Sequence, residues 1–265
     1  MTPNLPTAPS AGERLRARQP VFGVVQTLPS PAIAELAVLC GFDFVILDCE
    51  HGVIDEGAHL ACLQVISAGG ALAAVRVRAN DFDAVARYLD FGADAILMPD
   101  VQSAQQAAAL VSAATHGPLG SRSTTGNSRA VRYGLGRRSD AQPPLLLALI
   151  EGARAIEQIG GIVATPGLSG VIVGPNDLAA DLGCGTDFNA KSYVDAFESI
   201  ERAAAAAGVL LGTKPHGSFT VSRLLQSGHH LIIASADIVA LREGLRAHLR
   251  AAHEPSGSGN SSVTL

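Results

Sequence analysis

Residues 72–100, LAAVRVRANDFDAVARYLDFGADAILMPD, contain the repeating unit that decides the fold. Two apolar runs, LAAVRV (72–77) and AILMPD (95–100), flank a segment at 80–92 whose apolar residues recur at helical spacing. That segment begins with asparagine, a common helix cap, and ends with glycine, a common helix terminator. A strand, a helix and a second apolar strand in this order indicate a parallel βαβ unit.

The same alternation continues on both sides of this unit, from about residue 20 to residue 250. Most of the apolar runs lack polar alternation, as is typical of parallel strands buried on both faces. The eight expected strands are 21–26, 42–48, 72–77, 95–100, 145–151, 170–174, 208–213 and 231–236. The helices between them are expected near 31–40, 55–68, 80–92, 102–115, 153–164, 189–207, 218–227 and 236–252. Eight such units predict a (β/α)₈ barrel forming one catalytic domain over 19–252, with a doubly wound open sheet as the alternative.

Composition and termini exclude several classes of protein. We expect residues 1–18 to be a flexible N-terminal segment without the apolar stretch of a signal peptide, and the polar residues 253–265 to be a disordered tail. The net charge of −5 argues against nucleic-acid and membrane-surface partners. The four cysteines lack CxxC spacing, which favours reduced thiols in a cytoplasmic protein over a zinc knuckle.

One interval, 116–143, is polar and glycine-rich and interrupts the alternation. It carries the arginines Arg122, Arg129, Arg132, Arg137 and Arg138. We assign it to the rim after the fourth strand, at the end of the barrel where active sites lie. A substrate lid, a subunit contact and a solvated loop are the three interpretations of it.

Ionisable residues follow the ends of several expected strands. They are Asp48, Glu50, His51, Arg76, Asp100, Glu151, Asp177, Lys214 and His216. The carboxyl ends of barrel strands meet at one rim, so we expect these side chains to surround one cavity. For any single residue, a salt bridge closing the barrel is the alternative interpretation.

Two of these carboxylates, Glu151 and Asp177, come from neighbouring strands. Two hard oxygen ligands with open positions suit Mg²⁺, Mn²⁺ or Co²⁺, with water and substrate completing the shell. The segment VGPNDLAADLG (173–183) predicts a turn opening a short helix at Asn176 or Asp177. Backbone N–H groups at such a terminus can bind a substrate carboxylate.

Several motifs together resemble a known family. They are FDFVILDCEHG, AVRVRAND, YLDFGADAILMPDVQSAQQA, PLGSRS, ALIEGARAIEQI and GLSGVIVGPNDLAADLG. In order and spacing they resemble the HpcH/HpaI aldolase family of class II pyruvate aldolases, from about residue 20 to 250. The resemblance implies a barrel of the phosphoenolpyruvate/pyruvate type. It also implies a metal-dependent aldolase that converts 4-hydroxy-2-oxo acids into pyruvate, or a related 2-oxo acid, and an aldehyde.

The resemblance also implies roles for individual residues. Glu151 and Asp177 correspond to the metal ligands. Arg76 corresponds to the arginine that binds the 2-oxo acid and stabilises its enolate, a task that suits a guanidinium in a water-poor site. His51 corresponds to the base region and is expected to pair with Asp90 across a subunit boundary.

The substrate carboxylate is expected at the backbone of Gly174, Asn176 and Asp177. The implied assembly is a trimer of dimers with an exchanged C-terminal helix. A histidine with an ordinary pKa near 6.5 also suits the removal of a proton from the 4-hydroxyl, in agreement with the implied role of His51.

Two positions depart from the family pattern. Leu149 stands where members commonly carry glutamine, and Lys214 stands where an apolar residue is usual. We interpret Lys214 as a substrate contact to an extra acidic group, the alternative being a solvent-facing lysine. A lysine at a strand end can also form a Schiff base, which would replace the metal mechanism.

Two further functions remain alternatives at this point. One is a lyase of the citrate-lyase type acting on a larger acyl or CoA substrate, with the basic interval 116–143 serving the phosphates. The other is a non-catalytic barrel that only binds a small molecule. Calorimetric titration with Mg²⁺ or Mn²⁺ separates the latter from an aldolase.

Overall fold

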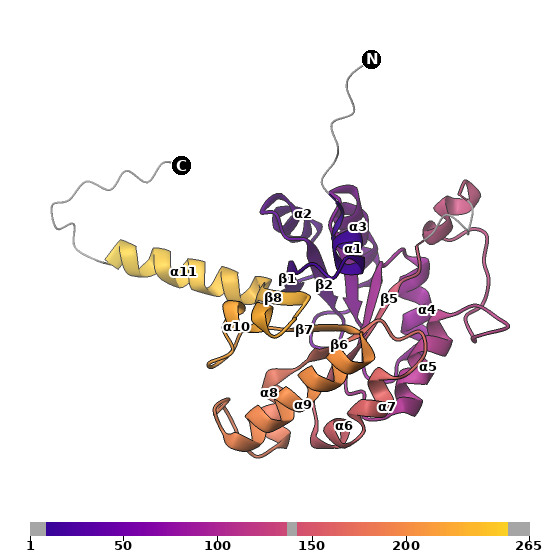
Figure 1. Cartoon of the computed structure of the whole chain (residues 1–265). Coiled ribbons are helices and arrows are strands. Elements are labelled where there is room, and N and C mark those ends of the chain that lie inside the picture. The colour runs from indigo at the N-terminus through magenta and orange to yellow at the C-terminus, as the bar shows by residue number, and fades with distance from the viewer. Residues whose placement is uncertain (1–8, 137–141, 254–265) are drawn as a thin grey trace.

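Eight parallel strands close into a barrel in chain order in the computed structural model, which describes residues 9–136 and 142–253 (Figure 1). The last strand pairs with the first, so the predicted (β/α)₈ barrel is confirmed and an open sheet is excluded. The strands are β1 (Val21–Gln26), β2 (Phe44–Asp48), β3 (Leu72–Arg76), β4 (Ala95–Met98), β5 (Leu145–Ile150), β6 (Gly170–Val173), β7 (Leu210–Thr213) and β8 (Leu231–Ala236).

Two apolar clusters explain why the strands are apolar throughout. One cluster fills the barrel and holds alternate strand residues such as Ile46, Ala74 and Leu149. The other lies between the barrel and its helices and holds the intervening residues, such as Val45 and Val75. Successive strand side chains point to opposite faces, so a strand buried on both faces must be apolar at every position.

Most of the expected helices cover the outside of this barrel. The longer ones are α2 (Pro31–Leu39), α3 (Glu56–Ala68), α4 (Phe82–Asp90), α5 (Ala104–Ala114), α9 (Lys191–Ala207) and α11 (Asp237–His253). The shorter ones are α1 (Ala11–Arg16), α6 (Ala153–Glu157), α7 (Ile159–Val163), α8 (Pro175–Asp181), α10 (Val221–Gln226) and a 3₁₀ segment η1 (Arg129–Gly134). The helix expected at 153–164 is thus divided in two, and the short helix predicted within 173–183 begins at Pro175.

Part of the N-terminal segment that we expected to be flexible is helical. Ser10 caps α1 through a reciprocal capping box with Glu13. Leu15 is buried in the cluster that fills the barrel, and Arg14 pairs with Asp43 just before β2. The helix α1 therefore closes the barrel at the N-terminal ends of its strands. Residues 1–8 and most of the predicted tail, 254–265, lie outside the described residues.

The basic interval 116–143 lies at the opposite end of the barrel from the one we predicted. It follows α5 and leads into β5, so it lies at the N-terminal ends of the strands. Arg122 pairs with Asp90 at the end of α4, and Arg129 donates hydrogen bonds to the carbonyls of Phe91 and Gly92. The prediction that this interval follows the fourth strand was wrong, because α5 lies between them. Arg137 and Arg138 are outside the described residues.

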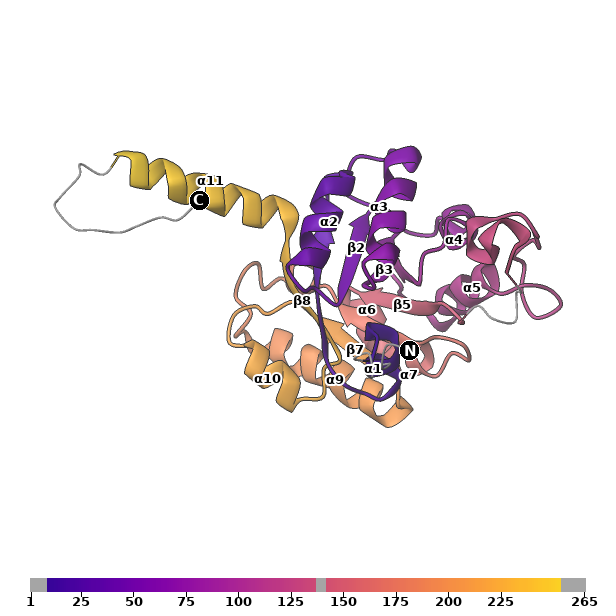
Figure 2. The ribbon, with the colours of Figure 1, turned by 90° about the horizontal axis from the view of Figure 1, so that it is seen from above.

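The last helix, α11, projects away from the barrel, and both views show it reaching past the rest of the molecule (Figures 1 and 2). None of its side chains is buried. Its apolar residues share one face and are exposed: Ile238, Leu241, Leu245 and Leu249. Within the described residues, no helix is long and apolar enough to cross a membrane.

Candidate active site

Strand alternation directs one set of polar residues into the mouth of the barrel at the C-terminal ends of the strands. For each member, the residue two or four positions earlier belongs to the cluster that fills the barrel. Side chains of the same parity point the same way, so the set continues the inward face beyond the apolar core. The members are Asp48, Arg76, Glu151, Gly174 and Lys214.

Asp48 and Arg76 are register partners on β2 and β3 and form a bidentate ion pair. Arg76 Nε donates to Asp48 Oδ1 at 2.9 Å, and Nη2 donates to Oδ2 at 2.7 Å. Burial by itself raises the pKa of Asp48. The hydrogen bonds and charge of Arg76 outweigh that effect, so the pKa lies below its ordinary value. Two contacts of this kind fix the plane of the guanidinium and direct Nη1 toward Glu50.

Glu50 and His51 extend this group toward the rim. Their backbone N–H groups both donate to Asp48 Oδ1, at 3.1 and 3.2 Å, so one carboxylate organises the turn after β2. Glu50 Oε2 lies 3.2 Å from Arg76 Nη1, but it is buried without a hydrogen-bond partner among the described residues. The His51 side chain is 67 % exposed, with Nε2 3.6 Å from Glu50 Oε2.

Glu151 follows β5 and lies deeper in the mouth. Its Oε2 accepts a hydrogen bond at 3.0 Å from the backbone N–H of Asp100, whose left-handed backbone (φ 51°) turns the chain after β4. Burial raises the pKa of Glu151 to about 7, and the charges of Glu50 and Asp177 add to the rise. A carboxylate in this position is poorly compensated without a cation.

Gly174, at the end of β6, makes the room that Glu151 occupies. A Cβ at this position would lie 2.6 Å from Glu151 Cγ and Oε1. Gly174 also precedes α8, whose first-turn N–H groups have no side-chain cap. Asn176 and Asp177 occupy that first turn and are exposed, and Asp177 is close enough to Glu50 and Glu151 to raise the pKa of both.

The donor set fits a hard divalent cation held by two carboxylates. Burial contributes most to the raised pKa of Glu151, Asp177 lies near enough for its charge to add to the rise, and Gly174 leaves room for the carboxylate. Among the described residues, no group of three or more His, Cys, Asp and Glu side chains could hold a metal ion.

The structure does not bring His51 and Asp90 together within one chain. His51 follows the C-terminal end of β2, whereas Asp90 is the last residue of α4 and lies toward the N-terminal end of β4. There Asp90 pairs with Arg122 at 2.5 Å. A pairing between His51 and Asp90 requires a second chain, as the resemblance implies.

Sequence reasoning singled out Lys214 and His216 after β7 but gave no account of what orients them. Lys214 is partly buried in the mouth, near enough to Asp177 and Arg76 for both charges to affect it. Burial lowers its pKa, the charge of Asp177 opposes that effect, and the charge of Arg76 adds to it. His216 turns away from the mouth and bonds Tyr193 on α9. The ion pair that orients Arg76 was also missed, although Asp48 was recognised as a strand-end carboxylate.

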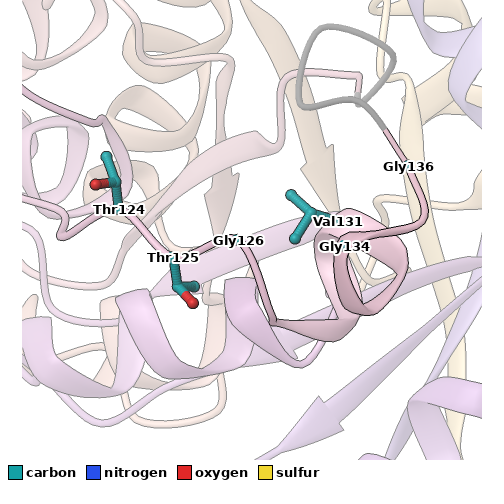
Figure 3. Close-up of a pocket in the computed structure, with 6 residues that line it drawn as sticks. All are labelled: Thr124, Thr125, Gly126, Val131, Gly134 and Gly136. Carbon is teal, nitrogen blue, oxygen red and sulfur yellow. The ribbon is translucent and has the colours of Figure 1, made fainter.

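A separate hollow lies within the basic interval (Figure 3). Its lining has no ionisable side chain and consists of Thr124, Thr125, Gly126, Val131, Gly134 and Gly136. This hollow therefore offers no side chain for acid–base or metal chemistry.

The sequence matches a family profile over nearly all of the described chain. Residues 22–243 match the family described as HpcH/HpaI aldolase/citrate lyase. The chain belongs to this family. The resemblance on which we based the site residues is thereby confirmed, and so is an enzyme of the carbon–carbon lyase class.

Relatives with named activities are similar over most of their length. The chain is 32 % identical over 247 residues to the hydroxypyruvate/pyruvate aldolase of Paraburkholderia phytofirmans, covering 89 % of this chain and 95 % of the relative. It is 29 % identical over 231 residues to a 5-keto-4-deoxy-D-glucarate aldolase of Escherichia coli, covering 86 % and 90 %. A crystal structure of a family protein from Burkholderia cenocepacia superposes with a TM-score of 0.84 at 30 % identity, covering 91 % and 98 %.

Proposed function

We propose that this member of the family is a divalent-metal-dependent aldolase. It cleaves or forms 4-hydroxy-2-oxo acids, with pyruvate or a related 2-oxo acid and an aldehyde as the small-molecule partners. The observation that carries the proposal is the convergence of Glu151, Asp177 and an Asp48-oriented Arg76 at one barrel mouth.

Each residue has a task in the proposed cleavage. The 4-hydroxyl loses a proton, the C3–C4 bond breaks, and its electron pair passes into the enolate of the 2-oxo acid, which is then protonated at C3. Glu151 and Asp177 would hold Mg²⁺, Mn²⁺ or Co²⁺, which supplies Lewis-acid polarisation of the 2-oxo group. Arg76, whose guanidinium plane is fixed by Asp48, stabilises the charge that develops on the enolate. The uncapped N–H groups near Gly174, Asn176 and Asp177 would donate hydrogen bonds to the substrate carboxylate.

We assign the removal of the 4-hydroxyl proton to His51. Its exposed ring at the rim is accessible to substrate and to a neighbouring subunit, which supports pairing with Asp90 of a second copy. An imidazole ring nitrogen is a general base of the kind that accepts such a proton.

The test is a screen of 2-oxo acids against an aldehyde panel with Mg²⁺, Mn²⁺ or Co²⁺ added. Activity is expected to disappear with EDTA and to return when metal is restored. Activity that survives chelation and is trapped by borohydride would instead assign a Schiff base to Lys214 and overturn the metal proposal.

The alternative of a CoA substrate loses its main support in this structure. It relied on the arginines of the interval 116–143 to bind phosphates at the active-site rim. In one chain that interval lies at the other end of the barrel, with Arg122 and Arg129 engaged by α4 and the turn after it. A small 2-oxo acid fits the mouth without it.

Replacing Asp48 with asparagine is expected to lower kcat/KM by about 10- to 100-fold, the range for losing a group that orients another. Asparagine has one acceptor oxygen, so it cannot hold Arg76 by two hydrogen bonds. Steady-state kinetics would measure the loss. Asp43→Asn, which breaks a similar pair with Arg14 at the far end of the barrel, is the control and should leave kcat/KM unchanged. Equal losses in both variants would contradict the role of Asp48.

We further propose that α11 is exchanged between two copies of the chain in a trimer of dimers. Its apolar face is exposed among the residues that the structure describes, and Ala234 on β8 is also exposed. An additional apolar surface suited to receive such a helix lies on α2, where Leu36 and Leu39 are 60 % and 77 % exposed. Contiguous exposed apolar surface of this kind is typical of subunit interfaces.

The double substitution Leu245→Glu with Leu249→Glu is expected to reduce the assembly to smaller species, because charges replace the apolar contact. Sedimentation velocity would measure this, with circular dichroism confirming that helix content is kept. Ala247→Glu adds a charge on the opposite face of α11 and is the matched control. An unchanged sedimentation profile in the double variant would contradict helix exchange.

A further inference from the structure

The loop after β7 is built around a half-buried histidine that the proposed chemistry does not use. His216 Nδ1 lies 2.7 Å from the carbonyl oxygen of Lys214, and His216 Nε2 lies 2.6 Å from the hydroxyl of Tyr193. A carbonyl only accepts, so Nδ1 carries the proton and donates to it. Burial lowers the pKa of His216, which favours the tautomer in which Nε2 accepts from the Tyr193 hydroxyl.

Aromatic packing holds the imidazole in this orientation. Phe219 stacks on His216 with ring centres 4.8 Å apart, and Phe188 meets it edge-on at 5.0 Å. Tyr193 and Phe219 are fully buried. The backbones of His216 and Phe219 exchange two hydrogen bonds, at 2.8 and 3.2 Å, so the turn between them is closed. The histidine therefore acts as a rigid connection between α9 and the backbone of Lys214.

The other side of Lys214 is fixed as well. Thr213 is buried, and its hydroxyl donates to the carbonyl of Val173 at the end of β6, at 3.0 Å. The lysine thus lies between an anchor to β6 and the contact with His216. Side chains that must reach a defined point are held in this way by neighbours that lock the backbone.

Two rigid anchors direct an ammonium group for which the described part of the chain supplies no partner. Within the described residues, the Lys214 ammonium makes no hydrogen bond or ion pair, although Asp177 and Arg76 are near enough to act on it electrostatically. A partly buried cation at the mouth of a cavity is a binding point for an anion.

We propose that Tyr193 and His216 are positioning residues that hold the Lys214 ammonium in the barrel mouth, where it binds a substrate carboxylate additional to that of the 2-oxo acid. This inference rests on the proposed aldolase function. The additional carboxylate belongs either to the acceptor aldehyde or to the donor. A lysine ammonium recognises both, and the substrates used in the test separate them.

The test compares charged and uncharged substrates in the intact protein. For the acceptor, kcat/KM is measured with glyoxylate and succinic semialdehyde against glycolaldehyde, with pyruvate as donor. For the donor, kcat/KM with oxaloacetate is compared with kcat/KM with pyruvate, and glycolaldehyde is the acceptor in both cases. We call the kcat/KM for the substrate with the additional carboxylate, divided by that for the substrate without it, the charged-to-uncharged ratio. In Lys214→Met this ratio is expected to fall at least tenfold in one of the two series. That series identifies the source of the carboxylate.

The positioning residues are tested through the same ratio. Tyr193→Phe keeps the ring but removes the hydroxyl, and is expected to lower the ratio about threefold or more through KM for the charged substrate. His216→Leu should lower it further, whereas His216→Asn keeps a donor for the Lys214 carbonyl and should restore part of it. Tyr88→Phe is the matched control, since its hydroxyl also bonds a buried histidine, His59, at 2.8 Å.

The outcomes separate this inference from the proposed function. Exchange of the pyruvate methyl protons in D₂O by the wild-type protein tests the aldolase function by itself. If exchange occurs and Lys214→Met changes charged and uncharged substrates equally, the carboxylate site is wrong. If Lys214→Met lowers the ratio but Tyr193→Phe and His216→Leu do not, or if Tyr88→Phe lowers it as much, the positioning role is wrong.

Discussion

Replacing Glu151 with glutamine is expected to reduce metal-dependent aldol cleavage by about 10²- to 10³-fold or more, the scale for losing a preorganised charged group. Glutamine keeps the shape of the side chain and an oxygen for the Asp100 N–H, so the barrel should fold normally. What is lost is one of two anionic ligands at the mouth. Asp177→Asn is expected to act in the same way from the start of α8. Pyruvate release with added Mn²⁺ would measure both.

Glu157→Gln is the control, because it makes the same change at an exposed position on α6, six residues further along. It should leave pyruvate release unchanged. Full activity in Glu151→Gln, with an unaltered metal requirement, would exclude Glu151 as a ligand.

The affinity for a divalent metal should also fall as the pH is lowered, because Glu151 becomes protonated. Its carboxyl has a pKa of about 7 without a cation, raised by burial and by the charges of Glu50 and Asp177. Below that pH a cation must displace a proton, so affinity for Mn²⁺ should fall by up to about tenfold per pH unit. Above pH 7 it should level off. Calorimetry at pH 6, 7 and 8 measures this, and Glu151→Gln should abolish the slope.

The second large effect is expected for Arg76→Ala, which should remove pyruvate enolisation. The variant loses the guanidinium that stabilises the enolate and leaves Asp48 buried at 3 % exposure without its partner. The cost includes that uncompensated charge, so a loss of about 10²- to 10³-fold is expected. Exchange of the pyruvate methyl protons in D₂O, followed by NMR, isolates this step from aldehyde binding.

Arg76→Lys separates charge from geometry. A lysine restores the positive charge but cannot make the two parallel hydrogen bonds to Asp48, so only part of the exchange should return. Arg87→Ala, at an exposed pair with Glu56, controls for the loss of an arginine and should exchange normally. Wild-type exchange rates in Arg76→Ala would show that the enolate is stabilised by other groups.

The sequence by itself was sufficient to predict the barrel and several strand-end residues that point into its mouth, although His216 turns away from it. Strand alternation has a period of two residues, so a run such as LAAVR both marks a strand and places Arg76 on its inward face. The same local rule applies to Asp48 and Glu151. Parallel strands in chain order bring those ends to one rim, whatever the details of packing.

The tertiary structure alone decided which of these groups contact one another. The pairing of Asp48 with Arg76 depends on the register of β2 and β3, and the contact between His216 and Tyr193 joins segments 23 residues apart. The tertiary structure also places the interval 116–143 at the N-terminal ends of the strands and shows that α11 projects away from the barrel. Local periodicity specifies the direction of a side chain. Contacts between distant segments depend on register, helix direction and closure, which no short stretch of sequence contains.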